Sequence, residues 1–267
     1  NANPMKRTIK YAVWLAVCGW LAAGCGESGE DGVTGVSGIR ASVEASAAEY
    51  AGDAGHVRLY LTDENSVISK SYSFNNLTEF NDAVLNLPLK AFRAVLFANL
   101  DPDVFEVPAV GEKADAAGCG IRAGAVVEKP LLSASADISG TASGVTLELE
   151  NVMARLTFGY PSPAEGTFVL RVGSPETGGG AELYEVAFEE EFAAGAPDFS
   201  VSCYLYPVVR GDVSITGAVG ESAFSFTPDR PEERYEAGHD YLFTVHSEPL
   251  GRSAASSVPR YVITLNR

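Results

Sequence analysis

Short segments with alternating apolar and polar residues constrain the fold of this chain more than any other feature. In residues 57–62 the odd positions hold valine or leucine, and residues 145–150 follow the same rule. Successive side chains of a β-strand point to opposite faces, so this period of two is typical of a half-buried strand. The segment Phe92–Ala98 is more continuously apolar, as in a central strand. The chain is therefore predicted to be built mainly from β-strands.

The alternation changes phase at Asn151. Up to Leu149 the apolar residues stand at odd positions, whereas from Val152 to Phe158 they stand at even positions. A shift of one residue turns every following side chain to the other face, so this position predicts a bulge or a crossing between sheets. Further strands are predicted at Thr167–Val172, Glu182–Glu189, Phe199–Tyr206, Asp212–Ala218, Ala223–Thr227, Tyr241–Ser247 and Arg260–Asn266.

A single helix is predicted, at Leu77–Leu85. Asn76 stands in the N-cap position, and Glu79 follows three residues later, as in a capping box. Strands and helices do not alternate along the chain, so the fold class is all-β, with two tandem antiparallel β-sandwiches. A loop of small residues at 140–144 precedes the phase change. We therefore expect an N-terminal sandwich at 41–145 and a C-terminal sandwich at 146–267.

The first 25 residues read as a lipoprotein signal. Three positive residues, Lys6, Arg7 and Lys10, precede the uncharged segment Tyr11–Ala23. This segment is shorter than the roughly 20 residues that a membrane span needs. It ends in the lipobox Leu21–Cys25, which predicts a signal peptide at 1–24 and a diacylglycerol on the Cys25 thiol. The alternatives are an ordinary signal peptide with a chance cysteine, or a membrane-anchored helix. Residues 25–40 would then form a flexible tether.

Charge and motifs exclude several classes of function. The chain has 19 Lys+Arg against 35 Asp+Glu, a net charge of −16, which opposes nucleic-acid binding. Gly-x-Ser-x-Gly, His-Glu-x-x-His, P-loop and Cys-x-x-Cys motifs are absent from the sequence. His239 and His246 would point to opposite faces of one strand, which opposes a shared metal. We therefore expect no catalytic residue, metal or cofactor, and a protein that is not an enzyme.

Three weaker candidates each have two interpretations. The carboxylates of 101–106 suit either calcium or an ordinary turn begun by Asp-Pro. Tyr204 and Tyr206 share a strand face and suit either stacking on a sugar or packing within the protein. Cys119 and Cys203 could form a disulfide in an oxidising compartment, or remain as two buried thiols.

Several segments resemble the fimbrillin superfamily of Bacteroidetes, especially its accessory and anchor group called FimB/Mfa2. The similar segments are the lipobox with its short tether, His56–Asn65, Leu87–Asn99, Asn151–Phe158 and Ala237–Val245. The resemblance implies two transthyretin-like Greek-key β-sandwich domains. It also implies a surface-exposed lipoprotein of the outer membrane that acts as anchor, tip or shaft subunit in fimbrial assembly and cell adhesion.

The resemblance further implies partners and sites. The partners would be the outer membrane, through the lipid, and other fimbrial subunits, through an added strand. In shaft subunits of the family an Arg-specific protease cuts near the first domain, which makes Arg40 the candidate cleavage site. Tyr261, Ile263 and Leu265 form one apolar face of a candidate donor strand. The alternative is that this strand is the last one of its own domain. A different function, glycan binding by a surface lipoprotein of a polysaccharide-capture system, also stays open.

Overall fold

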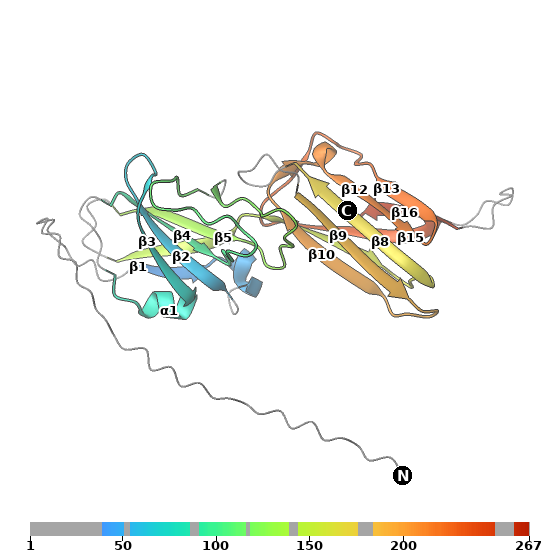
Figure 1. Ribbon diagram of the computed structural model, residues 1–267, viewed down its shortest axis with the longest axis horizontal. Helices are drawn as coiled ribbons and strands as arrows, with labels where there is room; N and C mark the ends of the chain where they lie inside the picture. Colours follow the sequence, from blue (N-terminus) through green and yellow to red (C-terminus); the bar gives the residue numbers. More distant parts are fainter. Residues whose placement is uncertain are drawn as a thin grey trace, which may run out of the picture. The chain divides into compact units, whose positions relative to one another are not determined.

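The computed structural model describes residues 39–50, 54–85, 91–115, 118–138, 144–175, 184–248 and 259–266. All of them belong to one compact unit. The signal segment, Cys25 and the tether as far as residue 38 lie outside the described residues. Ile39 and Arg40, which the sequence assigned to the tether, already form part of a strand. The predicted all-β class is confirmed. The strands form two groups, one within residues 39–151 and the other within residues 154–265 (Figure 1).

Six strands form the first sheet, in the order β1-β6-β5-β4-β2-β3. Their bounds are β1 Ile39–Val43, β2 Gly55–Thr62, β3 Ile68–Asn76, β4 Arg93–Ala98, β5 Leu132–Asp137 and β6 Val145–Asn151. The pairing of β1 with β6 is parallel, and the other pairings are antiparallel. Alternate residues of β2 and β4 face opposite cores, so the apolar run at Phe92–Ala98 is indeed a central strand buried on both faces.

The first sheet curls so that its two edge strands, β1 and β3, both reach the helix α1, Leu77–Asp82. Arg40 Nη1 donates to the carbonyl of Asn81 at 2.7 Å, and the amide of Ala41 donates to Asn81 Oδ1 at 2.7 Å. The space inside the curl holds what we call the first core. Its largest members are Ile39, Val57, Leu59, Leu61, Phe80, Leu96, Leu132, Leu147 and Leu149.

The predicted helix cap is confirmed, but the helix is shorter than expected. Asn76 Oδ1 accepts a hydrogen bond from the amide of Glu79 at 2.9 Å. The helix ends at Asp82, three residues early, because only Phe80 is buried and Val84 beyond it is 85% exposed. A 3₁₀ helix, η1 at Ala45–Tyr50, was not predicted.

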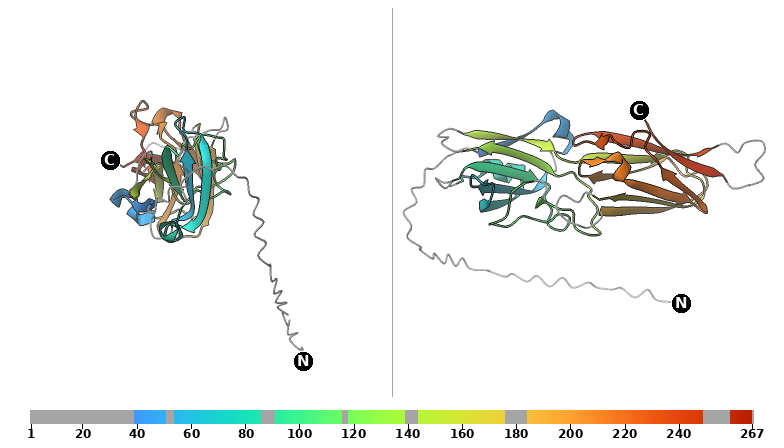
Figure 2. Two further views of the ribbon diagram at one scale, coloured as in Figure 1. Left: turned by 90° about the vertical axis from the view of Figure 1, so that its left-hand side faces the viewer. Right: turned by 90° about the horizontal axis from the view of Figure 1, so that it is seen from above.

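The C-terminal half is a sandwich of two four-stranded sheets, β10-β7-β15-β16 and β13-β12-β8-β9 (Figure 2). Their bounds are β7 Ala154–Tyr160, β8 Gly166–Ser174, β9 Tyr184–Phe192, β10 Phe199–Leu205, β12 Ser214–Val219, β13 Ser222–Phe226, β15 Asp240–Glu248 and β16 Arg260–Leu265. The short strands β11 (Val208–Val209) and β14 (Arg234–Tyr235) pair with each other. β7 and β15 pair in parallel, so this sandwich is mixed rather than purely antiparallel.

The phase change at Asn151 marks the crossing between the two sheet systems. Leu147 and Leu149 of β6 face the first core, whereas Leu156 and Phe158 of β7 face a second core. The domain boundary was predicted between residues 145 and 146, and β6, which begins at Val145, is hydrogen-bonded within the first sheet. The sequence placed the boundary at the small-residue loop, but the crossing follows the last strand before the slip.

The second core is shared by the two halves. It contains the outer face of the first sheet (Tyr60, Val95, Phe97), residues of the 99–131 segment, and the interior of the C-terminal sandwich. Because the outer face of the first sheet is covered in this way, residues 59–61 of β2 and residues 94–98 of β4 are apolar on both sides. This explains why contacts do not separate the two halves into independent units.

An aromatic and ionic contact joins η1 to the C-terminal half. The hydroxyl of Tyr204 donates to the hydroxyl of Tyr50 at 3.2 Å, and the two rings meet edge-on. Arg155 Nη1 lies 3.6 Å from Glu49 Oε1, and its guanidinium lies over the ring of Tyr204. Burial alone would lower the pKa of Arg155, but its neighbours, Tyr204 first among them, raise it. Arg155 therefore remains charged beside Glu49.

The candidate disulfide is not formed. Cys119 and Cys203 are both free and both fully buried in the second core. Each is enclosed by apolar side chains, and burial raises the pKa of each thiol to about 12. Of the two interpretations of these cysteines, the structure shows the pair of buried thiols.

We predict that Leu156→Ala lowers the free energy of unfolding by about 2–5 kcal/mol, because it opens a cavity in the second core. Chemical denaturation followed by circular dichroism measures the change. Leu242→Ala is the matched control, since Leu242 lies on the neighbouring strand β15 but is 47% exposed. It should cost less than about 0.5 kcal/mol. Equal losses for the two variants would contradict the assigned strand faces.

We also predict that neither Cys119 nor Cys203 reacts with iodoacetamide at pH 8 in the native protein. The pH lies far below the raised pKa of both thiols, and burial denies the reagent access. Mass spectrometry of a chain that begins at Gly26 should show no adduct before denaturation and two adducts in guanidinium. Rapid labelling of either thiol in the native protein would show that its burial is wrong.

Candidate functional site

The candidate donor strand lies in its own sheet. β16 pairs antiparallel with β15, with Ile263 opposite Val245 and Leu265 opposite Phe243. Tyr261 and Ile263 are buried, and Leu265 is half-buried against the second core. The structure therefore shows the alternative interpretation, in which this segment is the last strand of its own domain.

Arg40 lies within β1, opposite Thr146 of β6. Its backbone is part of a parallel pairing, and its side chain is bonded to α1 as described above. A protease would have to separate this strand locally before cleaving there.

The weaker candidates have structural roles. The hydroxyl of Tyr206 donates to the carbonyl of Cys119 at 2.6 Å, and both Tyr204 and Tyr206 are buried, so neither offers a surface to a sugar. Asp101 Oδ1 accepts from the amide of Asp103 at 2.9 Å, as in a turn begun by an aspartate. His239 precedes β15 and His246 lies within it.

Among the described residues, no three His, Cys, Asp or Glu side chains come together as metal ligands. None of the helices in this part of the chain has the length and apolar character needed to cross a bilayer.

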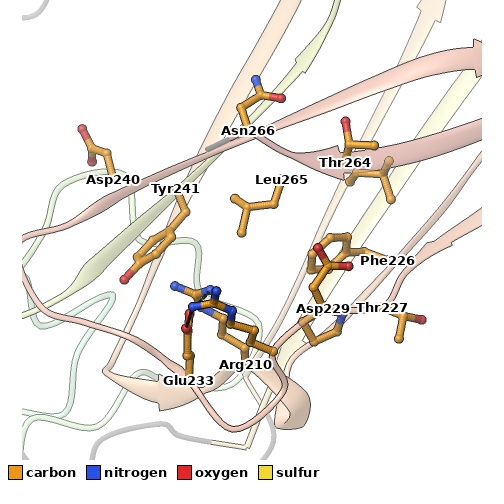
Figure 3. A pocket seen from close by; sticks show the side chains of 13 residues that line it. Arg210, Phe226, Thr227, Asp229, Glu233, Asp240, Tyr241, Thr264, Leu265 and Asn266 are labelled. Carbon is orange, nitrogen blue, oxygen red and sulfur yellow. Dashed lines mark hydrogen bonds and ion pairs between the residues drawn. The ribbon is translucent and has the colours of Figure 1, made fainter.

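An open pocket of about 620 Å³ lies in the C-terminal half (Figure 3). It lies where the end of β16 meets the start of β15, the end of β13 and the turn that contains Arg210. Its lining residues are Arg210, Phe226, Thr227, Pro228, Asp229, Arg230, Glu233, Asp240, Tyr241, Ile263, Thr264, Leu265 and Asn266.

Arg210 organises one side of this pocket. Its guanidinium lies 5.5 Å from the ring centre of Tyr235 and 5.2 Å from that of Tyr241. Arg210 Nη1 is 2.7 Å from Glu233 Oε2, and the other oxygen of Glu233 pairs with Arg230 at 2.7 Å. The Arg210 side chain is only 18% exposed. Neighbours on three sides therefore fix the position of Arg210, although it shares Glu233 with Arg230 and its buried Nε has no hydrogen-bond partner among the described residues.

Tyr241 is held in place as well. Its hydroxyl accepts from the amide of Glu236 at 3.0 Å, and its ring meets the ring of Tyr235 edge-on at 4.8 Å between centres. In Figure 3, Tyr241, Arg210 and Glu233 gather on one side of the pocket, Phe226 and Asp229 lie on the other, and Leu265 lies between them. The pocket thus has a rigid, partly aromatic wall and a polar rim.

Sequence reasoning did not find this pocket. Its residues come from four separate stretches of the chain, and their types are individually ordinary for turns and strand ends. The one available signal was the concentration of charged and aromatic residues between 226 and 241, which contains no spacing rule typical of a known site.

Comparison with known proteins identifies the fold. The sequence matches no protein-family profile and no curated protein. A protein from Bacteroides ovatus, provisionally described as a cell adhesion protein, superimposes with a TM-score of 0.54 at 14% identity, over 88% of this chain and 96% of its own. A protein from Bacteroides thetaiotaomicron, provisionally described as polysaccharide binding, gives 0.52 at 11% identity, over 77% of this chain and 89% of its own.

The fimbrial anchor protein Mfa2 from Porphyromonas gingivalis is also matched, over 85% of this chain and 95% of its own, at 14% identity and a TM-score of 0.39. At such identities the comparison concerns the fold alone, and the two overlays above 0.5 establish it. The chain therefore shares the fold of the Bacteroides ovatus and Bacteroides thetaiotaomicron proteins.

Proposed function

We propose that this protein is a lipid-anchored protein of the outer-membrane surface that serves as a subunit or anchor of a fimbria and takes part in cell adhesion. The observation that carries the proposal is the fold shared with the Bacteroides ovatus cell adhesion protein along nearly the whole of both chains. The lipobox at Cys25 and the fimbrillin-like segments of the sequence support the same role.

The role is one of binding and assembly rather than catalysis. Among the described residues, the pocket described above lacks a cysteine, serine or histidine that could act as nucleophile or base. Arg210, on one side of the pocket, is held in place by Glu233, as expected of a rigid binding surface.

Assembly would use the open edges of the sheets. In the described part of the chain, β3, β9 and β10 each pair on one side only, whereas the free edge of β1 is bonded to Asn81 and the edges of β13 and β16 lie beside each other. An edge strand presents unpaired backbone groups to which a strand of another subunit can add. Of these three strands, β9 is less suited, because Glu189, Glu190 and Glu191 are all exposed along it and would repel a second acidic chain.

A second candidate function is glycan binding by a surface lipoprotein. One observation favours it, namely the fold shared with the Bacteroides thetaiotaomicron protein described as polysaccharide binding. The two functions are compatible, since an adhesive subunit needs a ligand.

We predict that Cys25→Ala removes the protein from the outer-membrane fraction. Lipid chains contribute about 0.8 kcal/mol per buried methylene, and stable anchoring takes more than one chain. Cell fractionation with immunoblotting measures the distribution, and Cys18→Ala, within the signal segment, is the matched control. An outer-membrane level equal to that of the wild type would refute lipid anchoring.

We predict that deleting the gene changes fimbriae at the cell surface, and that the chain is recovered with purified fimbriae. Electron microscopy would show fimbriae that are lost, shed or altered in length. N-terminal sequencing of the recovered chain separates the roles, since an anchor retains Cys25 and a cleaved shaft subunit begins after Arg40. Unchanged fimbriae that lack the chain would exclude the fimbrial role.

A further inference from the structure

We propose that the pocket between β13, β15 and β16 binds a neutral saccharide. This inference deepens the proposed adhesive function, because it assigns a ligand class and a location to it. The pocket volume of about 620 Å³ lies within the range of small-ligand sites and leaves room for more than one sugar ring.

The interior of the pocket matches the apolar faces of a sugar ring. Phe226, Tyr241, Ile263 and Leu265 line it, and all of them except Ile263 are half-buried, so each keeps surface available to a ligand. A pyranose ring presents carbon-bound hydrogens on its faces, which pack against aromatic and aliphatic side chains. Because Tyr241 is fixed by its hydroxyl bond and by Tyr235, its ring would lose little freedom on binding.

The rim matches the hydroxyl groups of a sugar. Asp229, Asp240, Thr264 and Asn266 are exposed and line the pocket. Carboxylate oxygens accept hydrogen bonds, while hydroxyl and amide groups both donate and accept them. A ligand with many neutral hydroxyl groups can form hydrogen bonds with such a mixed set, in which Asn266 is already bonded to Thr244.

Charge disfavours the other ligand classes. Two arginines and three carboxylates line the pocket, a net charge of −1, and Glu233 already pairs with both arginines. An anionic ligand such as a phosphate or a sulfated glycan would therefore meet a surplus of negative charge in the pocket, to which Asp229 and Asp240 contribute. The carboxylates do not form a metal-binding group among the described residues.

The test is binding of neutral oligosaccharides to the full-length protein in detergent. A panel of hexose and N-acetylhexosamine oligosaccharides is first screened on an array together with sialylated, sulfated and amino-sugar counterparts. Isothermal titration then measures the affinity for the neutral compounds that bind. We expect binding to neutral members and not to the sialylated or sulfated ones. Absence of neutral binders, or selective binding of charged ones, would overturn the proposal.

Variants locate the site. Asp229→Asn changes an exposed rim group and should weaken binding roughly tenfold through a lost charged hydrogen bond. Tyr241→Ala should also weaken it, whereas Tyr241→Phe keeps the ring and should retain most of the affinity. Glu189→Gln on the distant strand β9 should leave the affinity unchanged.

If Tyr241→Ala lowers the melting temperature, the affinity of Asp229→Asn alone tests whether the sugar binds in this pocket. Neutral binding that all these variants leave intact would place the sugar elsewhere and refute the assignment.

The outcome is distinguishable from that of the proposed function. Localisation and fimbrial morphology do not depend on the pocket, so Asp229→Asn cells should assemble fimbriae normally while losing sugar binding. Normal sugar binding in a protein that is absent from fimbriae would instead leave the pocket assignment in place and remove the fimbrial role.

Discussion

The crossing from the first sheet to the second depends on three residues, Asn151, Val152 and Met153, which are held by hydrogen bonds. The amide of Val152 donates to Leu131, the amide of Met153 donates to Asn151 Oδ1, and the carbonyl of Met153 accepts from Gly238. Met153 itself is fully buried. Because β7, which follows at once, is paired on both sides, any shift of this crossing would displace the register of the whole sheet.

The shared second core follows from that crossing. With β7 fixed directly after β6, the interior of the C-terminal sandwich continues into the covered outer face of the first sheet. Burying both faces of β4 requires apolar residues along its buried part, and residues 94–98 meet the requirement. The contact of Arg155 with Glu49 and Tyr204 adds a polar connection between η1 and the C-terminal half. The two halves are therefore best understood as one folding unit rather than as two independent domains.

The sequence predicted structural features that depend on neighbouring residues, and it missed features that depend on contacts between distant parts of the chain. Period-two alternation predicted most of the strands, the Asn76 cap predicted the helix start, and the phase change predicted the crossing. Asn99 illustrates the limit. It adopts a positive φ of 61°, with its side chain bonded to Gly55 and Pro130, which only the folded chain brings together. The pocket and the parallel pairings of β1 and β15 depend on such long-range contacts, so no single segment of the sequence predicts them.

The position of β16 connects assembly with ligand binding. Ile263, Thr264, Leu265 and Asn266 line the pocket only while β16 is paired with β15. If the strand left to complement a neighbouring subunit, those four residues would leave with it, and the buried side chains of Tyr261 and Ile263 would have to be replaced. Donation of the C-terminal strand and binding in this pocket are therefore mutually exclusive in one molecule. A subunit that retains β16 keeps a complete C-terminal sandwich and all the residues that line the pocket.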